Sequence, residues 1–377
     1  MKINSAQFDD IRPYYEAEIP AAMQRIAGDH LFPLLSSYVY PSRPITEVRQ
    51  LVQNIRTIKG FQQEVMKNFD EQVITRSISE FSYEGISLID SDKKYLFVSN
   101  HRDIVLDSSL LQYILFKNDM DTTEITFGAN LMSTPLIIDI GKSNKMFKVE
   151  RGGNMKDFYK SLLHLSEYIR HTITVKRQSI WIAQRNGRTK DGNDLTDQGV
   201  IKMFCMSCPD KKVTSLAELG IVPVAVSYEW EPCDILKALE LYNSIGTRYI
   251  KKPGEDLNSI LTGIFQKKGK VHISICEPVT QEDLESLADV NDNEYHRKVA
   301  NLIDERIKRH YRLSCNNYIA LDLLHGENKY SKFYTTEQKE AFLSNMKRLE
   351  EYSVEKPEVL KKIFLNIYAN PITKKIS

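Results

Sequence analysis

The sequence reads YLFVSNHRDIVLD at residues 95–107, and this stretch decides the fold. Its first five residues are mostly apolar and include the aromatic and β-branched types that are typical of a buried strand. The strand ends in Ser-Asn and is followed at once by His101. Aspartates stand at 103 and 107, where a helix is predicted to begin. A strand end can hold an imidazole rigidly while the helix start supplies a carboxylate, which is half of a general-base site. The alternative is a loop histidine beside aspartates that only cap the helix.

Around this stretch, apolar runs of strand length alternate with segments of helical periodicity. The candidate strands are 95–99, 124–127, 179–183, 222–227 and 270–276, and the clearest helices between them are 105–117 and 155–171. Such alternation is typical of an α/β domain. We therefore predict a central mixed sheet that is flanked by helices.

Both ends of the chain have helical patterns instead. Val48, Leu51, Val52 and Ile55 recur at helical spacing near the start, and a last helix is predicted to begin at Pro357 and to end near Asn370-Pro371. We predict three regions: a helical N-terminal region at 1–84, an α/β domain at 85–290 and a C-terminal helical extension at 291–377.

The composition excludes several classes of protein. The 377 residues are 42% hydrophobic and 27% charged with a net charge of +1, which is ordinary for a soluble globular protein and gives no overall attraction for nucleic acid. No uncharged apolar run approaches the roughly 18 residues of a membrane span, and the N-terminus lacks the pattern of a secretory signal. We therefore expect a cytoplasmic location. The five cysteines are sparse, and the CxxC at 205–208 has no second pair, so we predict neither a disulfide framework nor a metal site.

Two further segments gather positive charge although the chain as a whole is almost neutral. Lys142, Lys145, Lys148 and Arg151 lie within ten residues, and the stretch 184–194 places cations and glycines directly after a strand. Guanidinium groups and glycine backbone suit a phosphate group. The alternatives are a solvated basic strand edge and, at Asn186-Gly187, a simple β-turn.

Taken together, these blocks resemble the glycerolipid acyltransferase superfamily, which includes glycerol-3-phosphate and lysophosphatidate acyltransferases. The similarity covers roughly residues 90–280. The first block is at 101–107, the second at 128–130 and 147–151, the third at 184–189 and the fourth at 222–224, with Glu277-Pro278-Val279 similar to the strand end that follows.

The resemblance implies that His101 and Asp107 are catalytic, and that Lys148, Arg151, Gly187 and Arg188 bind a substrate phosphate. The chain departs from the family pattern in two places. The family separates its His and Asp by four residues, but here position 106 is Leu and acids stand at Asp103 and Asp107. We assign the pairing to Asp107, and Asp103 is then a local cap or an accessory contact. Asn186 occupies the place of the third block's Glu, which leaves the choice of acceptor open.

The resemblance implies an O-acyltransferase that moves a fatty acyl group from a thioester to a glycerol-phosphate or lysophospholipid hydroxyl. It would need no cofactor, because acyl carrier protein or coenzyme A delivers the acyl group as a co-substrate. We expect peripheral binding at the cytoplasmic face of a membrane and no nucleic-acid partner. Two alternatives remain: an acceptor that is a lyso-aminolipid or another hydroxylated lipid, and an inactive homologue that binds lipids or anions.

Overall fold

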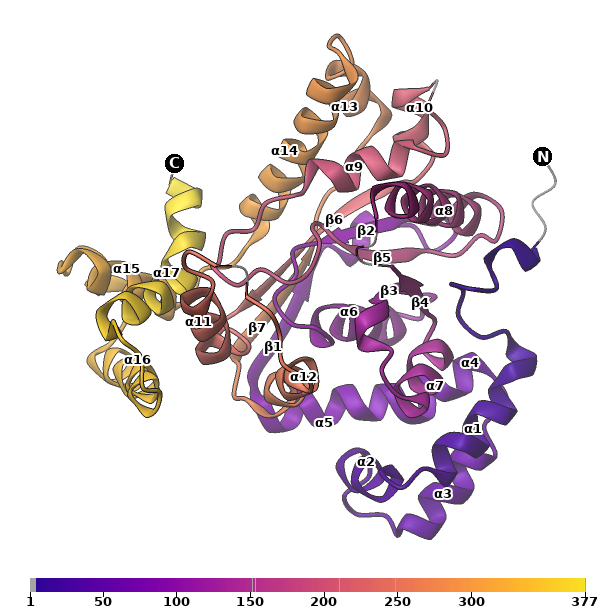
Figure 1. The fold of residues 1–377 in the computed structure, drawn as a ribbon, viewed down its shortest axis with the longest axis horizontal. Coiled ribbons are helices and arrows are strands. Elements are labelled where there is room, and N and C mark those ends of the chain that lie inside the picture. Colours follow the sequence, from indigo (N-terminus) through magenta and orange to yellow (C-terminus); the bar gives the residue numbers. More distant parts are fainter. Residues whose placement is uncertain (1–4, 151, 153, 210, 248, 377) are drawn as a thin grey trace.

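A computed structural model describes residues 5–150, 152, 154–209, 211–247 and 249–376. Its centre is a seven-stranded sheet with the strand order β1-β7-β6-β2-β5-β3-β4. The pairs β6–β2, β2–β5, β5–β3 and β3–β4 are parallel, as is β1–β7, and β6 and β7 are antiparallel. The predicted mixed sheet with helical regions at both ends is confirmed (Figure 1).

The strands are β1 (Ile78–Glu84), β2 (Leu96–Ser99), β3 (Glu124–Gly128), β4 (Met146–Val149), β5 (Ile180–Ala183), β6 (Ile221–Tyr228) and β7 (Gly269–Ile275). The helices up to the middle of the chain are α1 (Ile19–Gly28), α2 (Phe32–Val39), α3 (Ile45–Gln53), α4 (Ile58–Phe61), α5 (Lys67–Ser77), α6 (Leu106–Lys117), α7 (Pro135–Ser143), α8 (Met155–Thr174) and α9 (Gln198–Cys205). Those that follow are α10 (Lys212–Ala217), α11 (Asp234–Asn243), α12 (Glu255–Phe265), α13 (Gln281–Ser286), α14 (Asp292–His310), α15 (Cys315–His325), α16 (Thr336–Lys347) and α17 (Pro357–Ile376).

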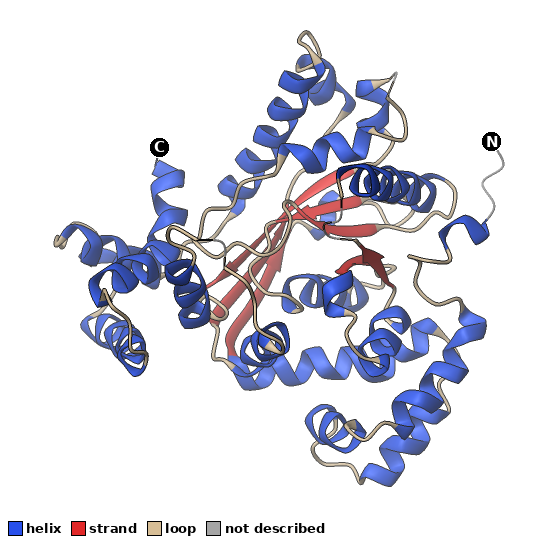
Figure 2. Cartoon of the chain, viewed as in Figure 1, coloured by secondary structure: helices blue, strands red, loops and turns tan. Residues whose placement is uncertain are grey.

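Helices cover both faces of the sheet, and the strands are therefore apolar on both sides (Figure 2). In β2, Leu96 and Val98 point into a core shared with α8, α9 and α14. The intervening Phe97 points into a second core that includes side chains from α5 and α6. Because side chains alternate along a strand, a four-residue strand of this composition serves both cores.

The sheet recruits its edge strand from the segment that the sequence suggested was helical. Residues 78–84 form β1, which pairs with β7, almost two hundred positions later in the chain. The exposed residues of β1 give it a weak hydrophobic pattern, and its partner is remote in sequence, so local periodicity did not reveal it. The five strands predicted from sequence are all present as β2, β3, β5, β6 and β7.

Separate apolar clusters hold the terminal helices together. One joins residues of α1, α2 and α3, and another joins α11, α15, α16 and α17. The expected end of the last helix near Pro371 is wrong, because α17 continues to Ile376. Pro371 has no N–H to donate to the carbonyl of Ile367. Gly192 packs against that carbonyl instead, so closely that a Cβ on Gly192 would lie 2.1 Å from the oxygen.

The parallel strands β6, β2, β5, β3 and β4 all end at the same edge of the sheet. His101 follows β2, Gly187 and Arg188 follow β5, Asn130 follows β3, and Glu231 follows β6. In open α/β sheets, this carboxyl edge is where ligands usually bind.

Candidate active site

The backbone of His101 is fixed by bonds from the two neighbouring strands. Asn100, directly before it, receives a hydrogen bond from the N–H of Val226 in β6 and donates one to the carbonyl of Val226. The N–H of Thr189, which follows β5, donates to the His101 carbonyl at 2.7 Å. The polar end of the β2 sequence therefore positions the imidazole, which is buried and forms a T-shaped contact with the Trp181 ring.

The carboxylate of Asp107 orients this imidazole. Its Oδ2 accepts a hydrogen bond from His101 Nδ1 at 2.9 Å and others from the N–H groups of Arg102 and Asp103. The hydroxyl of Tyr228 donates to Oδ1 at 2.8 Å. Asp107 is fully buried and stands in the first turn of α6, where the helix dipole also favours negative charge.

This arrangement decides which imidazole nitrogen can act as a base. Because Asp107 accepts at Nδ1, the neutral ring carries its proton there and presents Nε2 as an acceptor. Burial and then the charge of Asp107 raise the pKa of Tyr228 well above its ordinary value, so the phenol remains a donor. The imidazole of His101 can therefore take a proton from a hydroxyl that reaches its Nε2.

Asp103 has a different role from Asp107. Its Oδ1 accepts from the N–H groups of Val105 and Leu106, which caps the start of α6. Its Oδ2 is buried and has no hydrogen-bond partner among the described residues. The backbone of α12 approaches this oxygen so closely that a Cβ on Gly263 would lie 2.1 Å away. The acid that pairs with His101 in this structure is thus Asp107.

Arg188 lies beside this group with most of its hydrogen-bonding capacity unused. The side chain is buried, and Nη2 donates to Ser259 Oγ of α12 at 3.0 Å. Nη1 makes no hydrogen bond with any residue that the structure describes. Burial opposes the charge of Arg188, but Cys233 and then the carboxylate of Asp103 raise its pKa above the ordinary value. Gly187 has a left-handed backbone at φ 74° with open space where a side chain would be.

Lys148, another predicted phosphate-binding residue, lies apart from the His101–Asp107 pair. Lys148 is in β4, three strands from β2, which corresponds to about 14 Å across the sheet. Its ammonium is 2.7 Å from Glu150 Oε1. Arg151 lies outside the described residues.

A buried ion network behind His101 was missed by the sequence analysis. The guanidinium of Arg102 contacts Asp194 Oδ2 at 2.6 Å and Glu231 Oε2 at 2.9 Å. Lys237 pairs with Glu231 and donates to the Arg102 carbonyl at 2.6 Å. Burial opposes the charge of Arg102, but the two acids raise its pKa well above the ordinary value. The cation next to His101 in sequence was the only signal, and its partners lie about 90 and 130 positions later.

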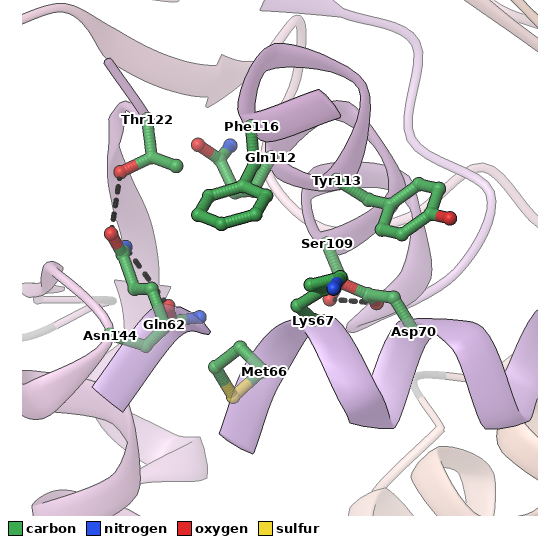
Figure 3. Close-up of a pocket in the computed structure, with 10 residues that line it drawn as sticks. All are labelled: Gln62, Met66, Lys67, Asp70, Ser109, Gln112, Tyr113, Phe116, Thr122 and Asn144. Atoms are coloured by element: carbon green, nitrogen blue, oxygen red, sulfur yellow. Dashed lines mark hydrogen bonds between the residues drawn. The ribbon is translucent and has the colours of Figure 1, made fainter. Parts of the chain in front are cut away.

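His101 lines neither of two cavities in the described part of the chain. One of about 340 Å³ is bounded by Asp194, Leu195 and residues of α14 and α17. The other, of about 20 Å³, has room for one water molecule and lies between α5 and α6 (Figure 3). In it, Thr122 donates to Gln62, Gln62 donates to Asn144, and Ser109 donates to Asp70 at 2.6 Å.

Searches of the described residues for two other features were negative. No group of three His, Cys, Asp or Glu side chains is arranged to hold a metal ion. No described helix is both long enough and apolar enough to cross a membrane. The five cysteines are free thiols.

Comparison with known proteins points to one family. The family model described as Acyltransferase matches residues 80–227. Glycerol-3-phosphate acyltransferase from Pseudomonas fluorescens (strain SBW25) is 26% identical over 200 residues, which is 52% of this chain and 22% of that protein. The enzyme of the same name from Pseudomonas syringae pv. tomato is 23% identical over 197 residues, with the same coverage. The matched segment thus spans about a fifth of these curated relatives. The crystal structure of the 1-acyl-sn-glycerophosphate (LPA) acyltransferase PlsC from Thermotoga maritima aligns with a TM-score of 0.39 and 13% identity, covering 77% of this chain and 94% of that one.

Proposed function

The chain belongs to the glycerolipid acyltransferase superfamily, and on that basis we propose that it transfers a fatty acyl group from a thioester to a hydroxyl of a glycerol-phosphate or lysophospholipid acceptor. The observation that carries the proposal is the buried His101–Asp107 pair at the carboxyl edge of the sheet. The donor would be acyl carrier protein or coenzyme A loaded with a fatty acid. Because the acceptors are membrane lipids or their precursors, the proposal includes peripheral membrane association.

In the proposed reaction, His101 Nε2 removes the proton of the acceptor hydroxyl as its oxygen attacks the thioester carbonyl carbon. The tetrahedral intermediate then collapses, the carbon–sulfur bond breaks, and the thiol leaves with the proton that the imidazolium returns. Asp107 stabilises the imidazolium throughout. Arg188 would hold the acceptor phosphate and so keep the hydroxyl beside the base.

The direct test is an acyl-transfer assay on the purified full chain with a labelled thioester and a panel of glycerol-phosphate, lysophosphatidate and lyso-aminolipid acceptors. We expect His101→Ala to lower kcat/KM by about 10²–10⁴-fold, which is the usual contribution of a general base. The matched control is His325→Ala, because His325 is exposed on α15. Turnover of His101→Ala at the wild-type rate would exclude the mechanism.

The acceptor panel also tests the alternative acceptor. Asn186 stands where the family has an acid, so a lyso-aminolipid that reacts faster than any glycerol-phosphate would favour that second reading. Wild-type protein that binds the acceptors but transfers no acyl group from either thioester would indicate a binding homologue.

A further inference from the structure

The outer side of α12 is apolar, which is unusual for a surface helix. Leu257, Leu261 and Phe265 recur every fourth residue and are 49%, 44% and 62% exposed. Residues four apart lie on one face of a helix, so they form a continuous stripe. Ile250, shortly before the helix, is 82% exposed. Leucine, isoleucine and phenylalanine scattered singly on a surface need no explanation, but a contiguous stripe indicates an interaction site.

The stripe continues onto α2. Phe265 meets the ring of Tyr38 edge-on, with the centroids 5.4 Å apart. Tyr38 belongs to α2, where Leu34 and Leu35 are exposed, as is Leu31 directly before the helix. Figure 1 shows α2 and α12 both beside α5, and both helices contact it. We call this combined surface the α2–α12 face; its apolar residues are Leu31, Leu34, Leu35, Ile250, Leu257, Leu261 and Phe265.

Positive side chains border the α2–α12 face. Arg76 of α5 stacks on Tyr38 at 4.8 Å, and Lys251, Lys252 and Lys267 are exposed at the two ends of α12. Arg43 is exposed just after α2. The acids nearby include Asp29, Glu47, Glu255 and Asp256. Two of them already bind within the chain, because Asp256 pairs with Lys251 and Glu255 accepts from the Tyr249 hydroxyl at 2.7 Å.

The inner side of the same helix touches the candidate active site. Ser259 accepts from Arg188 at 3.0 Å, and Asp256 accepts from Asn130, in the loop after β3, at 2.9 Å. Gly263 packs against Asp103. One helix therefore separates the apolar face from the residues that would bind the acceptor.

We propose that the α2–α12 face docks on an anionic phospholipid bilayer, with the apolar side chains in the interface and the basic border on the lipid headgroups. Apolar side chains ringed by lysine and arginine are the features that anchor a peripheral helix. The inference deepens the proposed function, on which it rests for its biological sense. Docking would place the Asn130–Arg188 side of α12 directly above the membrane that contains the acceptor.

The test is sedimentation of the full chain with vesicles, which needs no turnover. We compare phosphatidylcholine vesicles with vesicles that contain about one third phosphatidylglycerol. Leu257→Ser/Leu261→Ser should lower partition onto the anionic vesicles by about tenfold or more, because two half-exposed leucines lose their apolar contact with lipid. Wild-type protein should bind the neutral vesicles more weakly.

The matched control is Leu88→Ser/Val175→Ser. These residues are 43% and 63% exposed. Leu88 follows the end of β1 and Val175 precedes the start of β5, so both lie at the edge of the sheet opposite the carboxyl edge that carries the candidate active site. The control should bind vesicles as the wild type does. Both double variants change only exposed positions, so their unfolding midpoints should match that of the wild type.

Four results would overturn the docking proposal: no binding of wild type to anionic vesicles, equal binding to neutral ones, wild-type binding by Leu257→Ser/Leu261→Ser, or an equal loss in the control. Dimers formed by wild type but not by Leu257→Ser/Leu261→Ser, without vesicle binding, would assign the face to a second copy. A protein that binds vesicles but transfers no acyl group would overturn only the proposed function. One that acylates a water-soluble acceptor without binding vesicles would overturn the docking and the proposed membrane association, but not the acyl transfer.

Discussion

Two sets of side chains lie next to His101: Arg102 with Asp107, and Arg188 with Asp103. Their hydrogen-bonding groups are satisfied to different degrees. Arg102 is enclosed by two carboxylates, and Asp107 accepts four hydrogen bonds from within the chain. Arg188 donates a hydrogen bond to a serine and interacts with Cys233, and both Arg188 and Asp103 keep a buried polar atom that no described residue satisfies, as does Asp194 in the first set. Unsatisfied buried groups are costly and therefore rare in native structures. The first set thus holds His101 and its surroundings in place, and in the second set the guanidinium of Arg188 is the group with hydrogen-bonding capacity left for a ligand.

Replacing Arg102, which is paired with two carboxylates, should have the largest effect on the free energy of unfolding. Arg102→Met leaves Asp194 and Glu231 buried without their main cation, which should lower the free energy of unfolding by about 3–5 kcal/mol. Arg188→Met loses one hydrogen bond to Ser259, so its effect on stability should stay below about 1 kcal/mol. Urea unfolding of both variants measures the difference. Equal stabilities would show that the two arginines do not differ as we describe.

Substitutions of Asp107 and of Asp103 should differ in their effect on kcat. Asp107→Asn removes the charge that holds the His101 tautomer and stabilises the imidazolium, and we expect kcat to fall about a hundredfold or more. Asp103→Asn keeps an oxygen that can cap α6, so its kcat should fall less than about tenfold. Steady-state kinetics decide the matter, and full activity in Asp107→Asn would remove it from the site.

Arg188 should matter for the acceptor instead of for stability. Loss of a charge-assisted pair to phosphate in Arg188→Met should raise KM for a phosphorylated acceptor about 10- to 100-fold, with little change in kcat. Arg188→Lys restores the charge without the planar fork and should recover part of the affinity. An unchanged KM would mean that the phosphate binds elsewhere, for instance at Arg151.

The smallest effect concerns Asp70, a buried acid that accepts a hydrogen bond from Ser109. Burial raises its pKa well above 3.8 in the folded state. At a pH above the ordinary pKa of 3.8, Asp70 loses its proton in the unfolded chain but keeps it in the folded chain. The free energy of unfolding therefore falls as the pH rises. Asp70→Asn should therefore raise the unfolding free energy at pH 7 by about 1 kcal/mol or more, with a smaller gain near pH 4. The control is the exposed Asp289→Asn, and an equal gain in both variants would contradict this account.

Local sequence patterns predicted the strand and the helix start at the centre of the site. The apolar run before His101 predicted β2, and the resemblance to the acyltransferase family selected Asp107 and Arg188. The structure places Asp107 beside His101 and Arg188 at the same edge of the sheet, because the ends of parallel strands meet at one edge. These features depend on residues within a few positions of each other or on the general geometry of sheets.

Features that depend on remote partners could not be predicted. Asp194 and Glu231 are ordinary surface-type residues until folding brings them to Arg102. Nothing in the spacing of 255–265 shows that α12 lies over Arg188, because Ser259 and Gly263 are small residues without a strong pattern. Local rules predicted that the last helix ends at Pro371. Helix α17 instead continues past Pro371, and Gly192 packs against the carbonyl of Ile367 that the proline leaves without its usual donor.

The contact between Gly192 and α17 also has a consequence for biosynthesis. Gly192 O accepts from Arg102, and the loop around it is held by Ile367 and by Asn370, which donates to the Asp191 carbonyl. A ribosome releases the His101 segment long before it has made α17. We therefore expect the nascent chain to lack a finished ion network behind His101 until α17 has emerged.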